Sequence, residues 1–289
     1  MTQRDFHHAF FIALMLAGTF LSGCSASPEA RNGLAQDIAL GGHLTAKQVV
    51  AQPYLLTSYD RVTAPGQPAD VYIEGDGLAW TGRTTKSPDP TPTDPLALRL
   101  AAIDPAANVI YLARPCQYTK MSDSQQACDN DDWTNARFSD RVVNAMSDAL
   151  DQIKAQTKVS GFNLIGYSGG GGIAALLSAG RSDVLSLRTV AGNLDHVRFN
   201  ANHRVSPMTG SVNPRDVADK TLNIPQLHFI GADDEIVTPD IFQSFHDAAV
   251  SHAVYPPCIR SEMVPGASHG DGWVERWPEL LRHSVSCAK

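Results

Sequence analysis

The sequence predicts one α/β domain built on a mostly parallel central sheet with helices on both faces. From about residue 43 onward, strand-like runs of β-branched and aromatic residues alternate with helix-like segments, a pattern typical of parallel sheets. The 289 residues are 43% hydrophobic, which is enough apolar side chain to bury a substantial core. A single folded unit of this length is common in this class.

Each element is predicted from its own residue pattern. Apolar side chains recur every three or four residues over 138–157, with Ser139 as a cap, which indicates a helix. Pro239 begins a second expected helix, 239–250, because proline is favourable in a first turn. The proline-rich stretch 81–95 is expected to be a surface loop. The remaining expected helices are 96–102 and 173–179, and the expected strands are 53–59, 70–74, 108–113, 161–165, 184–190, 226–230 and 260–264.

The composition excludes several classes of function. The chain has 23 basic and 30 acidic residues, for a net charge of −7. Because nucleic-acid binding needs a basic surface, no nucleic-acid partner is expected. No apolar run reaches the roughly 18–20 residues that span a bilayer. The acidic run 129–132 lacks the glycine and the distal glutamate of a calcium loop, and no metal-binding cysteine spacing occurs. We therefore expect no metal, and the motifs described below imply no organic cofactor either.

Residues 1–23 have the features of a secretory signal. Arg4 supplies positive charge, 9–21 is an apolar run, and small residues precede Cys24. The tetrapeptide Leu-Ser-Gly-Cys resembles the bacterial lipobox, in which the thiol is acylated and the chain is cut just before it. The resemblance implies a mature chain that begins at Cys24 and is held to a membrane by its lipid. An ordinary signal peptide that ends in a cysteine is the alternative.

The residues after Cys24 add a location. Serine at position 25, where aspartate would retain the protein, is similar to the pattern sent to the outer membrane in bacteria with two membranes. We therefore expect an exported protein anchored to the outer membrane, facing the periplasm or the cell surface. The small and polar stretch 24–42 is expected to be a lipidated tether, and 43–289 the folded domain.

Four further cysteines are expected to form disulfides, because an exported protein meets an oxidising compartment. Three pairings of four cysteines are possible. The most local pairing, which we favour, joins Cys116 to Cys128 and Cys258 to Cys287. Buried free thiols are the alternative.

Chemistry-bearing residues follow three predicted strands, at the sheet edge where parallel sheets carry their sites. The segment Gly-Tyr-Ser-Gly-Gly, 166–170, lies between a strand and a helix. A GxSxG sequence in that context is a nucleophile elbow, whose glycines permit a tight turn that exposes the Ser168 hydroxyl. A phosphate-binding loop is excluded because no Lys-Ser or Lys-Thr follows the glycines.

An acid and a histidine follow in the chain. The segment 231–239 comes directly after a strand and contains Asp233, Asp234 and Glu235, and His269 lies in a loop of small residues after the last predicted strand. A carboxylate holds the tautomer of a catalytic histidine, which takes the proton of the nucleophilic serine.

Together these motifs resemble the α/β-hydrolase superfamily over residues 43–289, which is the expected catalytic domain. The order Ser…Asp…His is that of the superfamily. The resemblance implies a triad of Ser168, Asp234 and His269, with Asp234 chosen by its spacing from the preceding glycine and the following valine. Asp195, which ends another predicted strand, is an alternative acid because some relatives place it there.

The resemblance extends to the segment 72–77, which follows an early strand where relatives often show His-Gly-x-Gly. It implies that the backbone N–H groups of Asp76 and Gly169 form an oxyanion hole. Glu74 stands where the histidine is common. That departure leaves the backbone role possible but weakens any transfer of a substrate class.

The resemblance implies a serine hydrolase that cleaves a carboxylic ester through an acyl-enzyme on Ser168. A small or medium ester is expected because no long apolar cap is present, although 199–219 occupies the position at which relatives insert a cap. A peptidase or thioesterase of the same fold is the enzymatic alternative, and a non-catalytic surface lipoprotein is the alternative of a different class. Candidates for the pocket wall are Trp80, Trp273 and Trp277.

Overall fold

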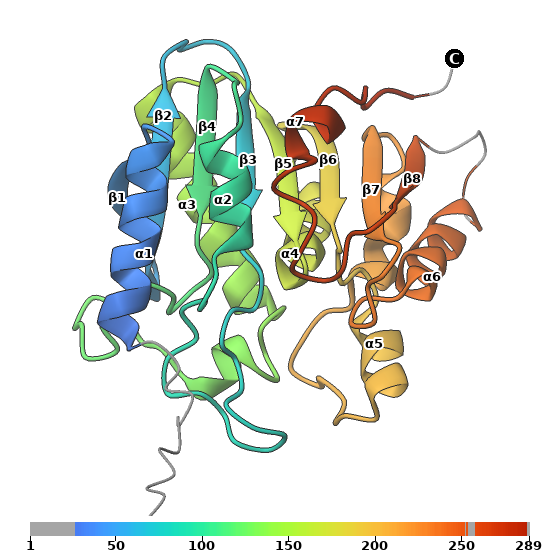
Figure 1. Cartoon of the computed structure of the whole chain (residues 1–289), viewed down its shortest axis with the longest axis horizontal. Coiled ribbons are helices and arrows are strands. Elements are labelled where there is room, and N and C mark those ends of the chain that lie inside the picture. Colours follow the sequence, from blue (N-terminus) through green and yellow to red (C-terminus); the bar gives the residue numbers. More distant parts are fainter. Residues whose placement is uncertain (1–26, 252, 254–257, 288–289) are drawn as a thin grey trace, which may run out of the picture.

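An eight-stranded sheet forms the centre of the chain, in the order β1-β2-β4-β3-β5-β6-β7-β8 (Figure 1). The computed structural model describes residues 27–251, 253 and 258–287. β2 is antiparallel to both β1 and β4, and all other neighbours are parallel, so the predicted fold class is confirmed. The strands are β1 (Thr45–Ala51), β2 (Tyr54–Val62), β3 (Ala69–Ile73), β4 (Asn108–Leu112), β5 (Phe162–Tyr167), β6 (Val184–Val190), β7 (Gln226–Gly231) and β8 (Ile259–Val264).

Helices cover both faces of this sheet (Figure 1). One face carries α1 (Pro28–Gly41), α2 (Leu96–Ala102) and α7 (Trp277–Leu280), and the other carries α3 (Asp140–Thr157), α4 (Gly169–Gly180) and α6 (Pro239–Val250). Among the described helices, none is both long and apolar enough to cross a membrane. The short helix α5 (His196–His203) lies beyond the ends of the parallel strands, and 3₁₀ helices occupy Asn130–Trp133 and Pro214–Thr221.

The central strands are buried on both sides, which explains their near-continuous apolar sequences. In β3, Val71 and Ile73 pack against the layer of α3 and α4, whereas Tyr72 points into the layer of α1, α2 and α7. In β4, Ile110 and Tyr111 divide between the two layers in the same way. Successive side chains of a strand face opposite sides, so both layers need apolar residues here.

The expected tether 24–42 is wrong over most of its length. Residues Pro28–Gly41 form α1, which Ser27 caps by accepting a hydrogen bond from the Ala30 N–H at 3.3 Å. Arg31, Ala35 and Ala39 lie four residues apart and are buried, and α1 packs on α2. Because that buried face consists of two alanines and an arginine, it shows no hydrophobic period. The folded domain therefore begins near residue 27.

The strand β1, the helices α5 and α7 and the two 3₁₀ helices were not predicted either. β1 is an edge strand in which only Val49 and Ala51 are buried, so its sequence lacks the apolar run of a central strand. α5 is short and largely exposed. By contrast, α2, α6 and β6 span the predicted residues.

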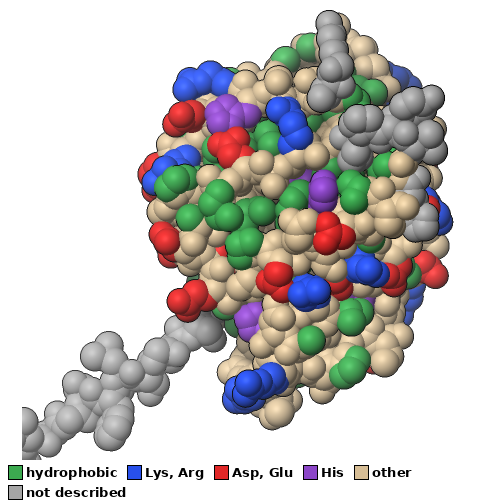
Figure 2. Space-filling view, turned by 90° about the vertical axis from the view of Figure 1, so that its right-hand side faces the viewer, with side chains coloured by type: hydrophobic (Ala, Val, Ile, Leu, Met, Phe, Trp, Pro, Cys, Tyr) green, Lys and Arg blue, Asp and Glu red, His purple; other side chains and the backbone are tan. Residues whose placement is uncertain are grey.

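Two disulfides are present, with the local pairing that we favoured. Cys116 and Cys128 are joined across the segment that follows β4, and Cys258 and Cys287 connect the start of β8 to the C-terminal segment. On the face that carries β8 and α6, acidic and basic side chains are interspersed (Figure 2), as expected for a mixed surface of modest net charge.

Candidate active site

Ser168 lies at a strained turn between β5 and α4. Its backbone has φ 51° and ψ −121°, a conformation that non-glycine residues rarely adopt and that concentrates at functional sites. The turn requires its flanking glycines. A Cβ at Gly166 would lie 2.5 Å from the carbonyl carbon of Gly170, and a Cβ at Gly170 would lie 2.5 Å from the carbonyl oxygen of Glu74. Larger residues at these positions would separate α4 from β5 and from the end of β3, so the tight elbow depends on both glycines.

The three side chains predicted to form a triad lie in one series of contacts. Ser168 Oγ is 3.0 Å from His269 Nε2, and His269 Nδ1 is 3.0 Å from Asp234 Oδ2. A carboxylate only accepts hydrogen bonds, so the imidazole proton lies on Nδ1 and Nε2 accepts from the serine hydroxyl. The Asp234 side chain is fully buried, whereas that of His269 is 21% exposed. This arrangement can transfer a proton from the serine to the imidazole.

Neighbouring groups hold the acid and the histidine in place. Asp234 Oδ1 accepts hydrogen bonds from the backbone N–H groups of Ile236 at 2.8 Å and Val237 at 2.9 Å. The indole N–H of Trp273 donates to the carbonyl oxygens of Ser268 and His269, at 2.8 and 3.2 Å. The bonds to Asp234 Oδ1 leave its Oδ2 available for the imidazole. The bonds from Trp273 hold the loop that carries His269.

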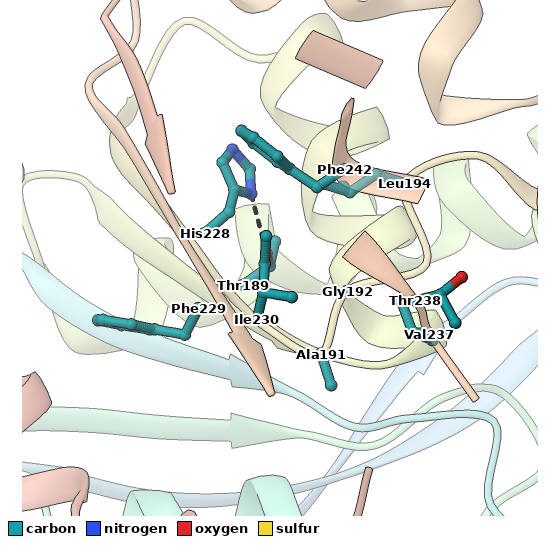
Figure 3. Close-up of a pocket in the computed structure, with 10 residues that line it drawn as sticks. All are labelled: Thr189, Ala191, Gly192, Leu194, His228, Phe229, Ile230, Val237, Thr238 and Phe242. Carbon is teal, nitrogen blue, oxygen red and sulfur yellow. Dashed lines mark hydrogen bonds between the residues drawn. The ribbon is translucent and has the colours of Figure 1, made fainter. Parts of the chain in front are cut away.

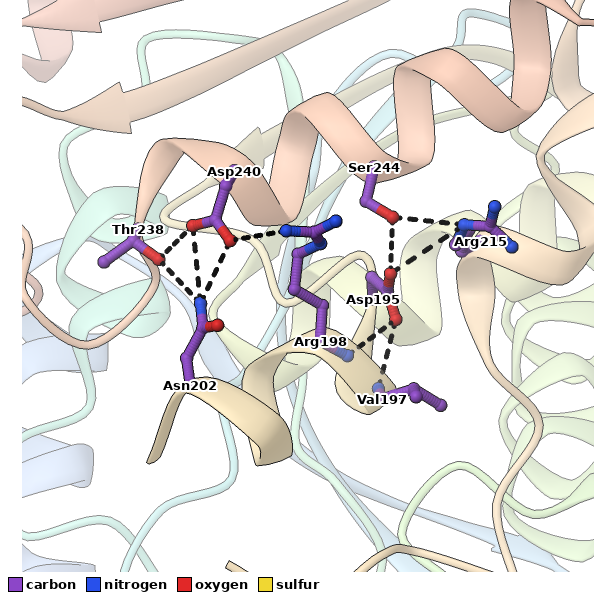
Figure 4. Close-up of polar contacts among 8 residues, drawn as sticks. All are labelled: Asp195, Val197, Arg198, Asn202, Arg215, Thr238, Asp240 and Ser244. Atoms are coloured by element: carbon purple, nitrogen blue, oxygen red, sulfur yellow. Dashed lines mark hydrogen bonds and ion pairs between the residues drawn. The ribbon is translucent and has the colours of Figure 1, made fainter. Parts of the chain in front are cut away.

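Asp195, the alternative acid, has other partners. It caps α5 by accepting from the N–H groups of Val197 and Arg198, and it also accepts from Ser244 Oγ (Figure 4). A further hydrogen bond comes from Asn213 Nδ2. All of these contacts are structural, and none involves the histidine of the site. The other two acidic neighbours in the turn after β7, residues 233 and 235, are exposed.

The three tryptophans proposed as pocket walls differ in their surroundings. Trp273 and Trp277 are completely buried. Trp277 belongs to the core, where its indole N–H donates to Tyr72 Oη at 2.9 Å, so its assignment to a pocket wall is wrong. Trp80 is 41% exposed, in the loop that follows the segment 72–77.

The two backbone N–H groups expected to form an oxyanion hole lie close together. A Cβ at Gly75 would be 3.4 Å from Ser168 Cβ, and a Cβ at Gly169 would be 2.6 Å from Asp76 Cγ. Within the described residues, the N–H groups of Asp76 and Gly169 donate to no protein acceptor. Gly169 is also the first residue of α4, whose N-terminus favours negative charge. Both groups are thus free to bind a developing oxyanion.

Two arginines that no sequence motif indicated hold the Asp76 carboxylate. Arg114 Nη1 lies 3.2 Å from Asp76 Oδ1, and Arg137 Nε lies 3.0 Å from Asp76 Oδ2. Both guanidinium groups also lie over the ring of Phe138, at 5.4 and 5.5 Å from its centroid. The two cations outweigh the one carboxylate, so the local charge beside the elbow is positive and favours an oxyanion.

Glu74 anchors the same segment from inside the fold. Its carboxyl group is completely buried, and it accepts hydrogen bonds from the Gly75 N–H at 2.9 Å and from Tyr111 Oη at 3.1 Å. Burial raises the pKa of Glu74 to about 7, against the smaller opposing effect of these hydrogen bonds. Glu74, which stands where relatives often have a histidine, is therefore a core residue beneath the segment 72–77, which we call the oxyanion segment.

A second histidine near the site has a structural role. His228 in β7 lines a cavity of about 10 Å³ between β6, β7 and α6 (Figure 3), a space of the order of one water molecule. Its Nδ1 lies 2.8 Å from Thr189 Oγ1 and its Nε2 lies 3.1 Å from Gln226 Oε1. Burial lowers the pKa of His228 to about 3, so this side chain is neutral.

The expected lipid-anchored N-terminus and the expected cap region remain to be placed. Cys24 and the signal 1–23 lie outside the described residues. The segment 199–219 contains the end of α5 and most of the 3₁₀ helix Pro214–Thr221. Among the described residues, no cluster of three or more potential metal ligands occurs.

The fold is that of the α/β hydrolases, and solved structures agree. The chain is similar to Est1E from Butyrivibrio proteoclasticus, with a TM-score of 0.55 and 15% identity over 82% of this chain and 95% of that one. It is similar to an alpha-beta serine hydrolase homologue from Coxiella burnetii, with a TM-score of 0.52 and 15% identity over 81% and 92%. The chain is also similar to a putative dipeptidyl aminopeptidase IV from Bacteroides ovatus, with a TM-score of 0.58 and 15% identity. That match covers 83% of this chain but only 35% of the other.

The family follows from the sequence itself. The model of the family described as serine hydrolase (FSH1) matches residues 97–256, more than half of the chain. The chain therefore belongs to the FSH1 serine hydrolases. The matched region includes Ser168 and Asp234, whereas His269 lies beyond it. No curated protein matches the chain.

A methyl group at Gly169 is expected to disable the site without unfolding the protein. In Gly169→Ala the new Cβ would overlap the Asp76 carboxylate and displace the oxyanion segment. We expect kcat/KM for a short ester to fall about 10²-fold or more, the usual effect of losing one oxyanion donor. The matched control is Gly180→Ala in the same helix, where a Cβ meets nothing within 4 Å and activity should be unchanged. Equal activity in both variants would contradict this role.

Burial of Glu74 predicts a specific pH dependence of stability. Because its pKa rises from 4.5 to about 7 on folding, its stabilising contribution is complete below pH 4.5 and is lost as the pH rises through about 7, by about 3 kcal/mol. Glu74→Gln should remove this loss, as measured by urea unfolding from pH 4.5 to 8 and compared with wild type. The exposed Glu279→Gln should retain the wild-type slope. An unchanged slope in Glu74→Gln would refute the assignment.

Proposed function

We propose that this serine hydrolase cleaves carboxylic esters through an acyl-enzyme on Ser168. The proposal rests on one observation: a serine, a histidine and a buried aspartate in hydrogen-bond contact, beside two unengaged backbone N–H groups. These are the parts that nucleophilic acyl transfer requires.

In the first half of the reaction, Ser168 Oγ attacks the ester carbonyl carbon while its proton moves to His269 Nε2. The carbonyl oxygen becomes an oxyanion and accepts hydrogen bonds from the N–H groups of Asp76 and Gly169. Asp234 stabilises the imidazolium that forms, without taking its proton. The tetrahedral intermediate then expels the alcohol, whose oxygen takes the proton from His269, and the acyl group remains on Ser168.

In the second half, water replaces the alcohol. His269 Nε2 takes a proton from the water as its oxygen attacks the acyl carbon, and the same two N–H groups stabilise the second oxyanion. Collapse releases the carboxylic acid and returns the proton to Ser168 Oγ. The net reaction is ester plus water to acid plus alcohol, and no cofactor takes part in it.

We favour an ester over a peptide because this chain matches most of Est1E but only a minor part of the peptidase among the similar structures. The putative dipeptidyl aminopeptidase IV matches this chain over 35% of its own length, so most of that protein has no counterpart here. Est1E, by contrast, is matched over 95% of its length. A small or medium ester is therefore the proposed substrate, with thioesters and peptides as the comparison substrates.

The nucleophile is tested with a fluorophosphonate, which bonds covalently to activated serines. Wild type should gain the mass of a single adduct and hydrolyse a short-chain ester. Ser168→Ala should gain no adduct and lose turnover on the order of 10⁶-fold. Ser160→Ala, which removes an exposed serine, should behave as wild type. An adduct on Ser168→Ala, or retained turnover, would show that another residue is the nucleophile.

We also propose that Cys24 carries a lipid that anchors the protein to a membrane, most simply the outer membrane. The support is the signal-like sequence before it and the small residues that precede the thiol. Cys24→Ser should leave the chain unprocessed at its higher mass or release it to the soluble fraction. A processed Cys24→Ser protein that stays in the membrane fraction as fully as wild type would reject the anchor.

A further inference from the structure

α1 begins at the same edge of the sheet as the site. β3, β5 and β6 end at Ile73, Tyr167 and Val190, and we call the edge that these three residues form the catalytic edge. Figure 1 shows that the parallel strands point toward this end of the sheet, and that α1, on the side of β1 and β2, starts at the same end and runs away from it. The point at which the chain enters the fold, Ser27, is thus on the catalytic side of the molecule.

Side-chain contacts fix that entry point relative to the oxyanion segment. The buried Arg31 donates to the carbonyl oxygens of Asp89 and Thr91, and its guanidinium lies 3.7 Å from the Asp89 carboxylate. The adjacent Pro90 carbonyl accepts from the Leu78 N–H at 3.1 Å. Leu78 follows the oxyanion segment by one residue, so a short series of contacts links the first turn of α1 to the site.

The chain between the proposed anchor and α1 is short. Cys24 precedes Ser27 by three residues, and three residues of extended chain reach at most about 11 Å. A lipid on the Cys24 thiol would be embedded in the bilayer. The start of α1, which lies at the same end of the sheet as the catalytic edge, would then lie within about that distance of the membrane surface.

Apolar side chains are exposed on loops at the catalytic edge. Trp80, in the loop after the oxyanion segment, is 41% exposed, and Ile236, two residues after Asp234, is 44% exposed. Val197 and Val205, in and after α5, are 60% and 48% exposed. The His203 imidazole donates to the Ile236 carbonyl at 2.7 Å, which places α5 beside that loop. Tryptophan and aliphatic side chains are favoured at a membrane interface.

We propose that the anchor holds the catalytic edge against the bilayer, and that the substrate is an amphiphilic ester presented at the membrane surface. The proposal rests on the hydrolase function and the lipid anchor proposed above. It explains why only three residues separate Ser27 from the proposed anchor, which limits how far the site can move from the membrane. It also explains why apolar side chains are exposed at the catalytic edge. A protein that acted on dissolved esters would need neither.

The first experiment lengthens the tether. About twenty Gly and Ser residues are inserted between Ala26 and Ser27, which keeps the helix cap and adds a span of about 25 Å. Lipidated wild type and variant are placed in phosphatidylcholine vesicles and given a water-soluble short-chain ester or a long-chain ester embedded in the same vesicles. We expect equal rates on the soluble ester and a roughly tenfold lower rate for the variant on the embedded ester. Equal rates on both esters would overturn the proposal.

The second experiment reads the orientation without turnover. The chain has four tryptophans, and three of them are buried, so Trp80 is the one exposed to lipid contact. Brominated phosphatidylcholine should quench the fluorescence of wild type, and Trp80→Phe should abolish most of that quenching. The control is Leu40→Ser, which removes an apolar side chain 74% exposed at the far end of α1 and should leave quenching intact.

The two experiments separate the possible failures. Quenching that does not depend on Trp80 would reject the membrane-facing edge, whatever the ester activity. Wild type that cleaves neither ester but shows Trp80-dependent quenching would reject the proposed hydrolysis of esters and retain the orientation. Failure of wild type to join the vesicles would reject the anchor on which the orientation depends.

Discussion

The close approach of two backbone segments is the constraint on which the rest of the site depends. The end of β3 meets the elbow after β5 closely because Gly170 faces the backbone carbonyls of Ile73 and Glu74, and because Gly169 leaves room for the Asp76 carboxylate. That contact places two free N–H groups beside Ser168. A methyl group at Gly170 would meet the carbonyl oxygens of Ile73 and Glu74, and one at Gly169 would meet the Asp76 carboxylate. These two glycines therefore determine the site as directly as the three side chains of the predicted triad do.

Charge around this contact is balanced by buried groups. The Asp76 carboxylate would oppose an oxyanion if it were alone, but two guanidinium groups hold it at 3.0–3.2 Å and leave the region positive. Glu74 lies beneath the same segment, and burial raises its pKa to about 7, so a large fraction of it is neutral at that pH. The two guanidinium groups and a Glu74 that is only partly ionised leave little negative charge around the segment, which suits a reaction that creates negative charge.

Local patterns predicted most of the fold and the side chains of the site. The GxSxG segment, the acid after β7 and the histidine after β8 each follow a strand, so their convergence at one edge could be expected from the sequence alone. Arg114 and Arg137 could not be expected, since they belong to no motif and reach Asp76 through the tertiary fold. α1 was missed because its buried side chains are two alanines and an arginine, which show no hydrophobic period.

The position of α1 limits how the domain can move relative to the proposed anchor. As a tether, residues 28–41 would have let the domain move freely. As a helix fixed to the loop at Thr91, they bring the proposed anchor to the side on which the site opens. In this proposal, the N-terminal segment both attaches the domain to the membrane and determines which side of the domain faces it.

A crystal structure of the phosphonate adduct would show which groups bind the serine adduct and its oxyanion. We predict a bond from Ser168 Oγ to phosphorus and a phosphoryl oxygen within about 3 Å of the backbone nitrogens of Asp76 and Gly169. His269 would remain hydrogen-bonded to Asp234. A phosphoryl oxygen bound by other donors, or phosphorus bonded to a different side chain, would contradict this mechanism.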